Sequence, residues 1–531
     1  MRYSVDRTSP QAIRSGRQPA AAAPPIRRLI VLPFVLGILA YALCFSFWQF
    51  EPVPTPVYLA AVLVAATCLF PMAHWYARGG TELPVFELIC LSYALQFSLP
   101  VYTQPNRVII QSQPVHLSWD GVYTALLAVE LGVLAMIAGY YVARRSPLAH
   151  WLPRFDLPLP LERRATYLRL ALPVGGMVTL LNAVGWAPLQ AKSVGAIVFL
   201  LASQLNMAIF LLTYTVYQAE KPGTAWRLSL YVTVAIAFAI GLTTGMLESA
   251  MIPLAVFLIA RWHATGKAPS LALLAGMVVF LLVLNPVKAE YRQQVWFGGE
   301  ATGLDQRLGV WTDLIQGQAT AVLDPERAVE NQADLTTSLA RFDLIHKFAY
   351  MQKLTPAVIP YYGGETYSYF IYAWIPRVLW PDKPTASDAN NRLDVDYRLK
   401  LKGQGSTISI GQLPEAYANF GLWGVVIVMA LQGFILSLLN SVLNGPRSEG
   451  GRVIYLTLLI YFLNGIGSLT IMLYGALLQH ILANALILRG FAGRFQAPPD
   501  EKLPVVPPPT YRPGRRQFGP AFGPRDWREH R

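Results

Sequence analysis

Long apolar runs, separated by short polar segments, make up most of the chain. Many windows of about 20 residues are nearly free of charge, and an α-helix of that length crosses the hydrocarbon core of a bilayer. The apolar blocks 227–262 and 453–489 are each too long for one such helix, and we expect them to break at Thr243-Thr244-Gly245 and near Gly467-Ser468. The pattern therefore predicts an all-α, polytopic integral membrane protein with about twelve transmembrane helices. The predicted spans are 29–50, 56–77, 83–103, 118–143, 166–185, 194–217, 227–243, 247–262, 268–286, 421–443 and two within 453–489.

The polar segments divide the chain into five regions. We expect a basic disordered cytoplasmic tail, nine transmembrane helices, a large periplasmic loop that carries the candidate active site, three more transmembrane helices and a Pro- and Arg-rich disordered tail. In order, these regions are 1–28, 29–285, 286–420, 421–493 and 494–531. Within the large loop, apolar residues recur at helical spacing over 334–353, which predicts amphipathic helices near the membrane face.

Basic residues gather in alternate polar segments, as the positive-inside rule expects of cytoplasmic loops. Segment 144–164 holds five Arg, whereas segment 51–55 has Glu51 and segment 186–193 has Lys192 as the single charged residue. This alternation predicts that both termini are cytoplasmic and that loop 286–420 faces outward, which in a bacterium means the periplasmic side of the inner membrane. The loop carries 13 basic and 15 acidic residues, and long loops cross a membrane whatever their charge.

Composition narrows the classes of function. Only 14% of the residues are charged, against about 25% in a typical soluble domain, and the mean hydropathy is +0.39. The net charge of +13 is what we expect of a membrane protein with basic cytoplasmic loops and tails. No soluble region is large enough for a nucleic-acid-binding fold, so we expect no nucleic-acid partner. Cys44, Cys68 and Cys90 fall inside predicted spans without metal or disulfide spacing. We therefore expect neither a metal nor a cofactor.

The segment Ile375–Pro384 is the first candidate for chemistry. Its three prolines stiffen the backbone and prevent a regular helix. Such a loop could hold Arg377 and Lys383 against a diphosphate, since a guanidinium fork matches two phosphate oxygens and an ammonium adds a point charge. The same residues could instead meet lipid headgroups at the membrane interface, with Trp374 and Trp380 in the aromatic belt.

Glu415 is the second candidate. It lies in the run Leu413–Gly421, directly before a predicted span, with Tyr417 and Asn419 close by in the sequence. Glycosyl transfer needs a group that takes a proton from the attacking hydroxyl or that orients it, and a carboxylate can do either. The alternative is an acid at a helix N-terminus that complements the helix dipole.

Aromatic residues crowd the stretch before the proline-rich loop, from Tyr361 to Trp374. Aromatic faces stack on the C–H faces of sugars, and tyrosine hydroxyls can bind ring hydroxyls. Tyrosine and tryptophan also mark membrane interfaces, so the sequence leaves both interpretations open. The candidate sugar-binding residues are Tyr367, Tyr372, Trp380 and Tyr417.

Three separated elements, in this order, resemble a known family. The family is that of the oligosaccharide repeat unit polymerases, the Wzy-type O-antigen and exopolysaccharide polymerases of bacteria. The elements similar to this family are the run from Arg341 through Pro360-Tyr361-Tyr362-Gly363-Gly364-Glu365-Thr366-Tyr367, the loop Ile375–Pro384 and the segment Glu415–Gly424. The resemblance covers roughly residues 240–440 and is strongest over 360–425. The family often has a basic residue after a Thr-Gly turn, but Thr244-Gly245 is followed here by Met246-Leu247-Glu248.

The resemblance implies a GT-C-like glycosyltransferase of the bacterial inner membrane that uses no nucleotide. It would join oligosaccharide repeat units carried on polyprenyl diphosphate into a surface polysaccharide, in contact with membrane lipid and with a flippase and a chain-length regulator as pathway partners. The leaving diphosphate would be bound and neutralised by four cations, Arg377, Lys383, Arg341 and Arg292. Arg377 would be catalytic because it stabilises the leaving charge. Glu415 would act as the base or assist it.

Two other functions remain open from the sequence. An O-antigen ligase-like glycosyltransferase would use the same parts and differ mainly in its acceptor. The other is a non-enzymatic flippase or a scaffold for a polysaccharide machine, and a flippase would show charges deep in the helix bundle and two related halves. The chain instead concentrates its charge in one outer loop, which favours an enzyme.

Overall fold

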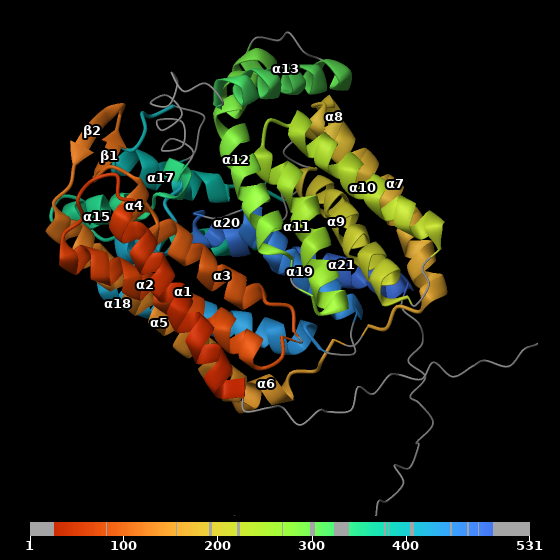
Figure 1. Cartoon of the computed structure of the whole chain (residues 1–531), viewed down its shortest axis with the longest axis horizontal. Coiled ribbons are helices and arrows are strands. Elements are labelled where there is room, and N and C mark those ends of the chain that lie inside the picture. Colours follow the sequence, from red (N-terminus) through yellow and green to blue (C-terminus); the bar gives the residue numbers. More distant parts are fainter. Residues whose placement is uncertain are drawn as a thin grey trace, which may run out of the picture. The chain divides into compact units, whose positions relative to one another are not determined.

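The structure is a computed structural model, and α-helices dominate it (Figure 1). It describes residues 26–80, 82–155, 157–190, 194–219, 223–267, 269–297, 303–322, 339–375, 379–380, 382–403, 408–445, 449–464, 467–475 and 477–491. Residues 1–25 of the predicted N-terminal tail and the whole predicted C-terminal tail, 494–531, lie outside the described residues.

Each predicted span coincides with helical backbone. The first group of helices is α1 (Ile26–Phe47), α2 (Thr55–Ala77), α3 (Val85–Tyr93), η1 (Ala94–Ser98), α4 (Pro100–Thr103), α5 (Trp119–Arg145), α6 (Pro147–Trp151), α7 (Leu161–Ala183), α8 (Ala187–Gln190), α9 (Gly195–Gln218), α10 (Thr224–Thr243), α11 (Leu247–Thr265) and α12 (Leu271–Arg292). The second group is η2 (Gln293–Phe297), α13 (Leu304–Val322), η4 (Ala340–Phe342), α15 (Ile345–Leu354), α16 (Glu365–Trp374), α17 (Ala386–Asp396), α18 (Gln412–Leu443), α19 (Glu449–Asn464), α20 (Thr470–Tyr474) and α21 (Leu477–Phe491).

Eight helical segments within the described residues are long and apolar enough to cross a membrane. Helix α1 adds a shorter apolar stretch, Phe34–Phe47. These segments confirm the coarse prediction of a mainly helical, membrane-embedded protein, and the count of twelve spans stays a prediction. The eight are Thr55–Ala77, Val85–Thr103, Trp119–Arg145, Gly195–Gln218, Thr224–Thr243, Leu247–Thr265, Gln412–Leu443 and Thr470–Phe491.

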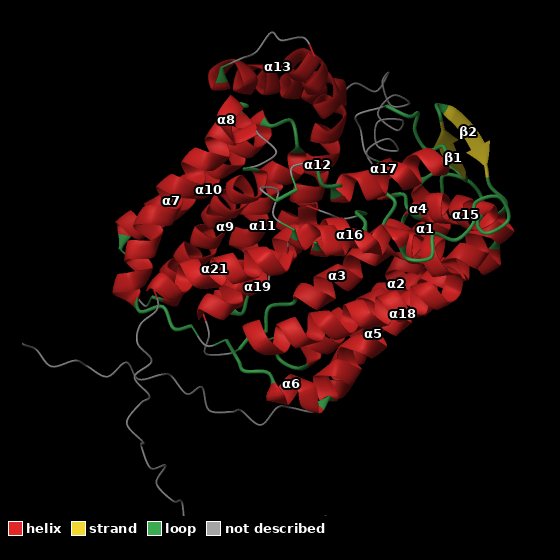
Figure 2. Ribbon diagram, turned by 180° about the vertical axis from the view of Figure 1, so that it is seen from behind, coloured by secondary structure: helices red, strands yellow, loops and turns green. Residues whose placement is uncertain are grey.

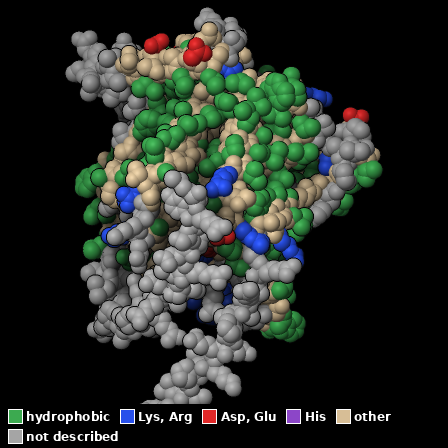
Figure 3. All heavy atoms as spheres, turned by 90° about the vertical axis from the view of Figure 1, so that its right-hand side faces the viewer, with side chains coloured by type: hydrophobic (Ala, Val, Ile, Leu, Met, Phe, Trp, Pro, Cys, Tyr) green, Lys and Arg blue, Asp and Glu red, His purple; other side chains and the backbone are tan. Residues whose placement is uncertain are grey.

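Helices α7 and α10 present exposed apolar side chains on their outer faces. Figure 3 views the molecule from the side that lies on the right in Figure 1 and shows hydrophobic side chains over much of the upper part of this face. Water would penalise a continuous apolar surface of this extent, whereas lipid tails would not. The exposed residues include Leu170, Val174 and Met177 on α7 and Leu228, Tyr231 and Ile236 on α10.

Helices α13 and α17 of the predicted outer loop lie toward one end of the long helices. Figures 1 and 2 both place α13 and α17 at the opposite end from α6. Helix α6 follows α5 in the Arg-rich segment 144–164. The Arg-rich segment 144–164 and these two helices of the predicted outer loop therefore lie toward opposite ends of the long helices.

A two-stranded antiparallel hairpin joins α4 to α5, and the hydropathy pattern did not predict it. Strands β1 (Arg107–Ile110) and β2 (Gln113–His116) are linked by Gln111 and Ser112, whose φ angles are 48° and 68°. Two residues with positive φ form the tight turn that matches the natural twist of a hairpin. At four residues each, the strands are too short for a clear alternating pattern.

Helices α5 and α18 pack with their backbones almost in contact. A Cβ atom at Gly433 would collide with the carbonyl oxygen of Met136, and one at Gly139 would collide with that of Ala430. Membrane helices have no hydrophobic driving force for association in lipid, so small residues that allow close van der Waals contact stabilise such pairs. This contact fixes the position of α18, whose first turns carry Glu415.

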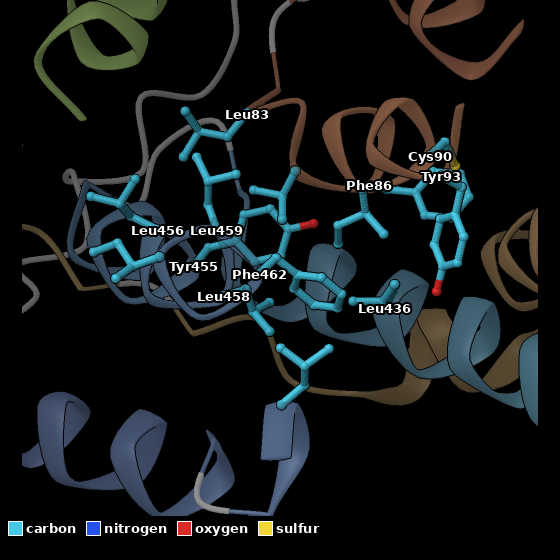
Figure 4. Close-up of a cluster of buried hydrophobic side chains, with 14 of the residues drawn as sticks. Leu83, Phe86, Cys90, Tyr93, Leu436, Tyr455, Leu456, Leu458, Leu459 and Phe462 are labelled. Carbon is cyan, nitrogen blue, oxygen red and sulfur yellow. The ribbon is translucent and has the colours of Figure 1, made fainter. Parts of the chain in front are cut away.

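The core next to this pair is formed by α3, α18 and α19. Figure 4 shows Phe86 and Tyr93 of α3, Leu436 of α18, and Tyr455 and Phe462 of α19 in one cluster of buried side chains. Because each of these side chains is buried, the cluster holds α19 and the following helices against α18.

We expect Gly433→Leu to destabilise the protein by about 1–3 kcal/mol, because the new side chain forces α5 and α18 apart. The measurement is the thermal unfolding midpoint of the purified protein in detergent. Gly176→Leu on α7 is the matched control, since a Cβ there meets nothing within 4 Å. Equal midpoints for the two variants would contradict the proposed close contact.

Candidate functional site

Helix α18 is interrupted at Gly421, nine residues after its start. Gly421 has φ 65° and ψ −152°, a conformation that residues with a Cβ rarely adopt. The break ends the first helical run at Phe420, which leaves backbone carbonyls of that run without partners in the helix. The sequence predicted a span from 421, whereas the helical backbone of α18 begins at Gln412 and includes Glu415.

The segment before α16 supplies the missing hydrogen-bond donors. The amide of Tyr362 donates to the carbonyl of Ala418 and that of Gly363 to the carbonyl of Asn419, each at 3.1 Å. The amide of Gly364 donates to Oδ1 of Asn419 at 3.0 Å. The break at Gly421 therefore fixes α16 beside the first turns of α18.

The carboxylate of Glu415 lies at the centre of this contact. Its Oε1 accepts from the Thr366 hydroxyl at 2.8 Å, and its Oε2 accepts from the Thr470 amide at 2.6 Å. The Asn419 amide donates to Thr366 Oγ1 at 2.8 Å and to the Glu415 carbonyl at 2.9 Å. We call Glu415, Thr366, Asn419 and Thr470 the Glu415 cluster.

All four side chains of the Glu415 cluster are buried, and Glu415 itself is 0% exposed. A buried carboxylate is costly unless hydrogen bonds satisfy it, and the two donors to Glu415 come from α16 and α20. The cluster therefore joins three elements that are far apart in the sequence. In this conformation both Glu415 oxygens are occupied.

Tyr367 lies between the Glu415 cluster and a cavity. Its ring stacks on Phe420 with 6.1 Å between centroids and 7° between planes. Burial, and then the negative charge of Glu415, hold the pKa of the Tyr367 hydroxyl well above its usual value. The hydroxyl therefore stays protonated and can act as a hydrogen-bond donor.

The cavity beside Tyr367 is an apolar groove of about 420 Å³. Thr470 of the Glu415 cluster and Tyr367 line it, so the groove reaches the polar cluster directly. Its size is within the range of small-molecule binding sites. The other lining residues, mostly aliphatic, are Phe370 of α16, Val428, Leu431, Gln432, Ile435 and Leu439 of α18, Tyr474 of α20, and Leu477, Leu478 and Ile481 of α21.

Lys383 lies at the C-terminal end of α16. Its ammonium donates to the carbonyls of Tyr372 at 3.1 Å and Ile375 at 2.6 Å, as a cation at a helix C-terminus commonly does. Gln479 of α21 is next in sequence to Leu478 of the groove, and its side-chain amide donates to the Ala373 carbonyl at 3.1 Å. Lys383 and Gln479 thus hold the end of α16 near the start of α21.

The other predicted diphosphate-binding residues are placed only in part. Arg377 lies outside the described residues, and so does the side chain of Arg341, whose backbone belongs to η4. Arg292 is the last residue of α12, and its side chain lies beside the turn between α10 and α11. Its Nε donates to the Gly245 carbonyl at 3.0 Å, and its guanidinium carbon lies 4.5 Å from the centre of the Trp296 ring. The predicted cluster of four cations stays a prediction.

The predicted sugar-binding residues separate into different places. Tyr372 and Trp380 contact each other edge to face at 5.7 Å, so the chain after α16 folds back on that helix. Tyr417 packs on Phe348 at 5.6 Å and on Tyr361 at 6.4 Å. Tyr367 alone of the four lines the apolar groove.

Sequence reasoning missed Thr366 and Thr470 as members of the site. Thr470 is 55 residues from Glu415 and contributes a backbone amide, which any residue but proline could supply. The chain also contains an Asp-x-Asp pattern, Asp394-Val395-Asp396. In the structure Asp394 is buried against Asn390 and Ile408, whereas Asp396 is exposed beside Tyr362. The two carboxylates therefore serve different contacts.

We expect Glu415→Leu to destabilise the protein by about 1–3 kcal/mol, because the Thr366 hydroxyl and the Thr470 amide lose their acceptor inside the fold. Thermal unfolding of the purified protein measures the effect. Glu365→Gln is the control, since its ion pair with Arg392 is about 40–50% exposed and such pairs contribute little. A Glu415→Leu midpoint no lower than that of Glu365→Gln would show that Glu415 does not hold the three elements together.

Comparisons with known proteins give a family and no relative of known function. Neither the curated proteins nor the solved structures contain a match to the chain. One family profile, described as a domain of unknown function (DUF8712), matches residues 180–489. This range is more than half of the chain and includes the Glu415 cluster and the groove. The chain therefore belongs to the DUF8712 family.

Proposed function

We propose that the protein is a nucleotide-independent glycosyltransferase that joins polyprenyl-diphosphate-linked oligosaccharide repeat units into a surface polysaccharide. It would work on the periplasmic face of the bacterial inner membrane, with twelve spans, a GT-C-like architecture and both termini in the cytoplasm. The observation that carries the proposal is the apolar groove that ends at a buried polar cluster. The resemblance to Wzy-type polymerases supplies the reaction.

The groove suits the carrier lipid. A polyprenyl chain is wholly hydrocarbon, and the groove is lined by aliphatic and aromatic side chains from α16, α18 and α21. Several of the lining side chains, such as Leu431, Ile435 and Leu478, are also exposed on the outer surface. A lipid tail could therefore enter from the bilayer side and place its polar end at Tyr367 and Thr470.

The end of α16 suits the diphosphate. Carbonyls at a helix C-terminus repel an anion, and Lys383 neutralises them by donating to them. In the sequence, Arg377 lies two residues after Ile375 and six residues before Lys383. In the proposal Arg377 binds the diphosphate bidentately and stabilises the charge that it gains on leaving.

The reaction itself is a displacement at an anomeric carbon. A hydroxyl of the acceptor repeat unit forms the new glycosidic bond, the bond from that carbon to the diphosphate breaks, and polyprenyl diphosphate leaves with the electron pair. The acceptor hydroxyl loses its proton to a base. Glu415 is 0% exposed, so it can take that proton only if the contact between α16, α18 and α20 opens, whereas Tyr367 is a residue of the groove lining.

We expect a deletion strain to accumulate single repeat units on the carrier, and wild-type protein to restore polymer. Arg377→Ala should lower polymer yield by about a hundredfold, as loss of a charge-stabilising group does. Ile435→Trp should also abolish polymer because it fills the groove. The measurement is the glycan profile on a gel, normalised to the amount of protein in the membrane.

Ile427→Trp is the control for the groove variant. It lies on the same helix, is 62% exposed and does not line the groove. Wild-type polymer from both Arg377→Ala and Ile435→Trp would refute the proposed site. Polymer that forms in the deletion strain but stays on its carrier would identify a ligase instead.

A further inference from the structure

A second cavity, of about 510 Å³, lies between the β1–β2 hairpin, η4, the start of α15, residues 399–401 and Ile408. It shares no residue with the apolar groove. None of its lining residues belongs to the site predicted from the sequence. Its lining is formed by Gln104, Pro105, Arg107, Val108, Ile109, Gln111, Ser112, Ala340, Asp343, Lys347, Leu399, Lys400, Leu401 and Ile408.

Basic side chains outnumber acidic ones in the lining of this cavity. Arg107, Lys347 and Lys400 line it, against the single acid Asp343. Asp343 Oδ1 is already bound to the ring of His346 at 2.8 Å. Lys400 also has an acidic partner, since its ammonium lies 3.6 Å from Asp394. The charges available to a ligand are therefore chiefly those of Arg107 and Lys347.

Lys347 is the best placed of the three cations. Its ammonium donates to the Ser409 carbonyl at 3.1 Å, and an ammonium carries three donors. Burial removes water from this ammonium and thereby lowers the pKa of Lys347. A nearby anionic group favours the charged form of a buried ammonium.

The remaining lining favours a sugar over a small inorganic anion. Gln111 and Ser112 offer amide and hydroxyl groups that match sugar hydroxyls, and Val108, Leu399 and Leu401 offer apolar surface for C–H faces. The volume is also much larger than a phosphate requires and is in the range of sites for larger ligands.

One wall of the cavity leads directly to the Glu415 cluster. Ile408 lines the cavity and its amide donates to Asp394 at 3.0 Å, and the next residue, Ser409, accepts from Lys347. Helix α18 begins at Gln412, three residues further on, and reaches Glu415 within its first turn. Ile408 of the cavity wall is therefore seven residues before Glu415 in the chain.

We propose that this cavity binds an acidic oligosaccharide, with Lys347 and Arg107 bound to its carboxylate and Gln111 and Ser112 bound to its hydroxyls. It would act as a glycan subsite separate from the lipid groove, and its assignment to the glycan rests on the proposed function. Saccharide binding itself is measured without polymerisation, so failure here and failure of the polymerase proposal can be told apart.

The test uses the full chain in lipid nanodiscs and measures binding of tetragalacturonate, maltotetraose and inorganic pyrophosphate by calorimetry. We expect tetragalacturonate to bind at least about tenfold more tightly than maltotetraose, since charge-assisted hydrogen bonds are roughly twice as strong as neutral ones. Lys347→Met should weaken tetragalacturonate binding by about tenfold. Lys353→Met, an exposed lysine on the same helix outside the cavity, should leave binding unchanged.

Ala340→Trp provides a second variant that changes no charge. Ala340 is exposed and lines the cavity, so the indole should block the cavity without affecting the fold. Equal binding of the acidic and neutral saccharides, or full binding by both Lys347→Met and Ala340→Trp, would overturn the proposal. Pyrophosphate that binds more tightly than tetragalacturonate and competes with it would also overturn it, in favour of a phosphate site.

Discussion

The interruption of α18 at Gly421 is the constraint on which the candidate site depends. A helix that ran on through this position would satisfy the carbonyls of Ala418 and Asn419 internally. Because the chain turns away at Gly421, these carbonyls instead accept from the amides of Tyr362 and Gly363. The free backbone groups of a broken helix thus attach α16 to α18, and α16 brings Thr366 to Glu415. A side chain at Gly421 would also meet the hydroxyl of Tyr361 at 2.9 Å.

The position of the break relative to the long helices gives the site its chemical character. Beyond Gly421, α18 packs against α5 through Gly433 and contributes aliphatic residues to the groove. Before Gly421, the same helix carries Glu415 and Asn419 into a hydrogen-bonded cluster. An apolar compartment therefore adjoins a polar one within a few residues. A molecule with a hydrocarbon tail and a polar head is the kind of ligand that such a junction fits.

The hydropathy pattern was enough to predict helices and their approximate positions, because burial in lipid imposes long apolar runs. The segments around Tyr367 and Glu415 were predicted from charged and aromatic residues outside the spans and from the family resemblance. The hydropathy pattern could not predict which segments meet, since Thr470 joins Glu415 through a backbone amide that leaves no trace in the sequence. The hairpin β1–β2 was missed because four-residue strands carry little periodicity. Lys383 is a further example. The sequence suggested that its ammonium binds phosphate, but it could not reveal that the ammonium donates to carbonyls at the end of α16.

Photo-crosslinking in living cells tests the central claim, that the groove binds the carrier lipid. Leu478 lines the groove and is 45% exposed, whereas Leu486 lies two turns further along α21, outside the groove, and is 71% exposed. Each leucine is replaced in turn by benzoylphenylalanine, and the adducts are weighed by mass spectrometry after irradiation. The account predicts polyprenyl diphosphate adducts at position 478 and ordinary phospholipid adducts at position 486. Phospholipid alone at both positions would contradict it.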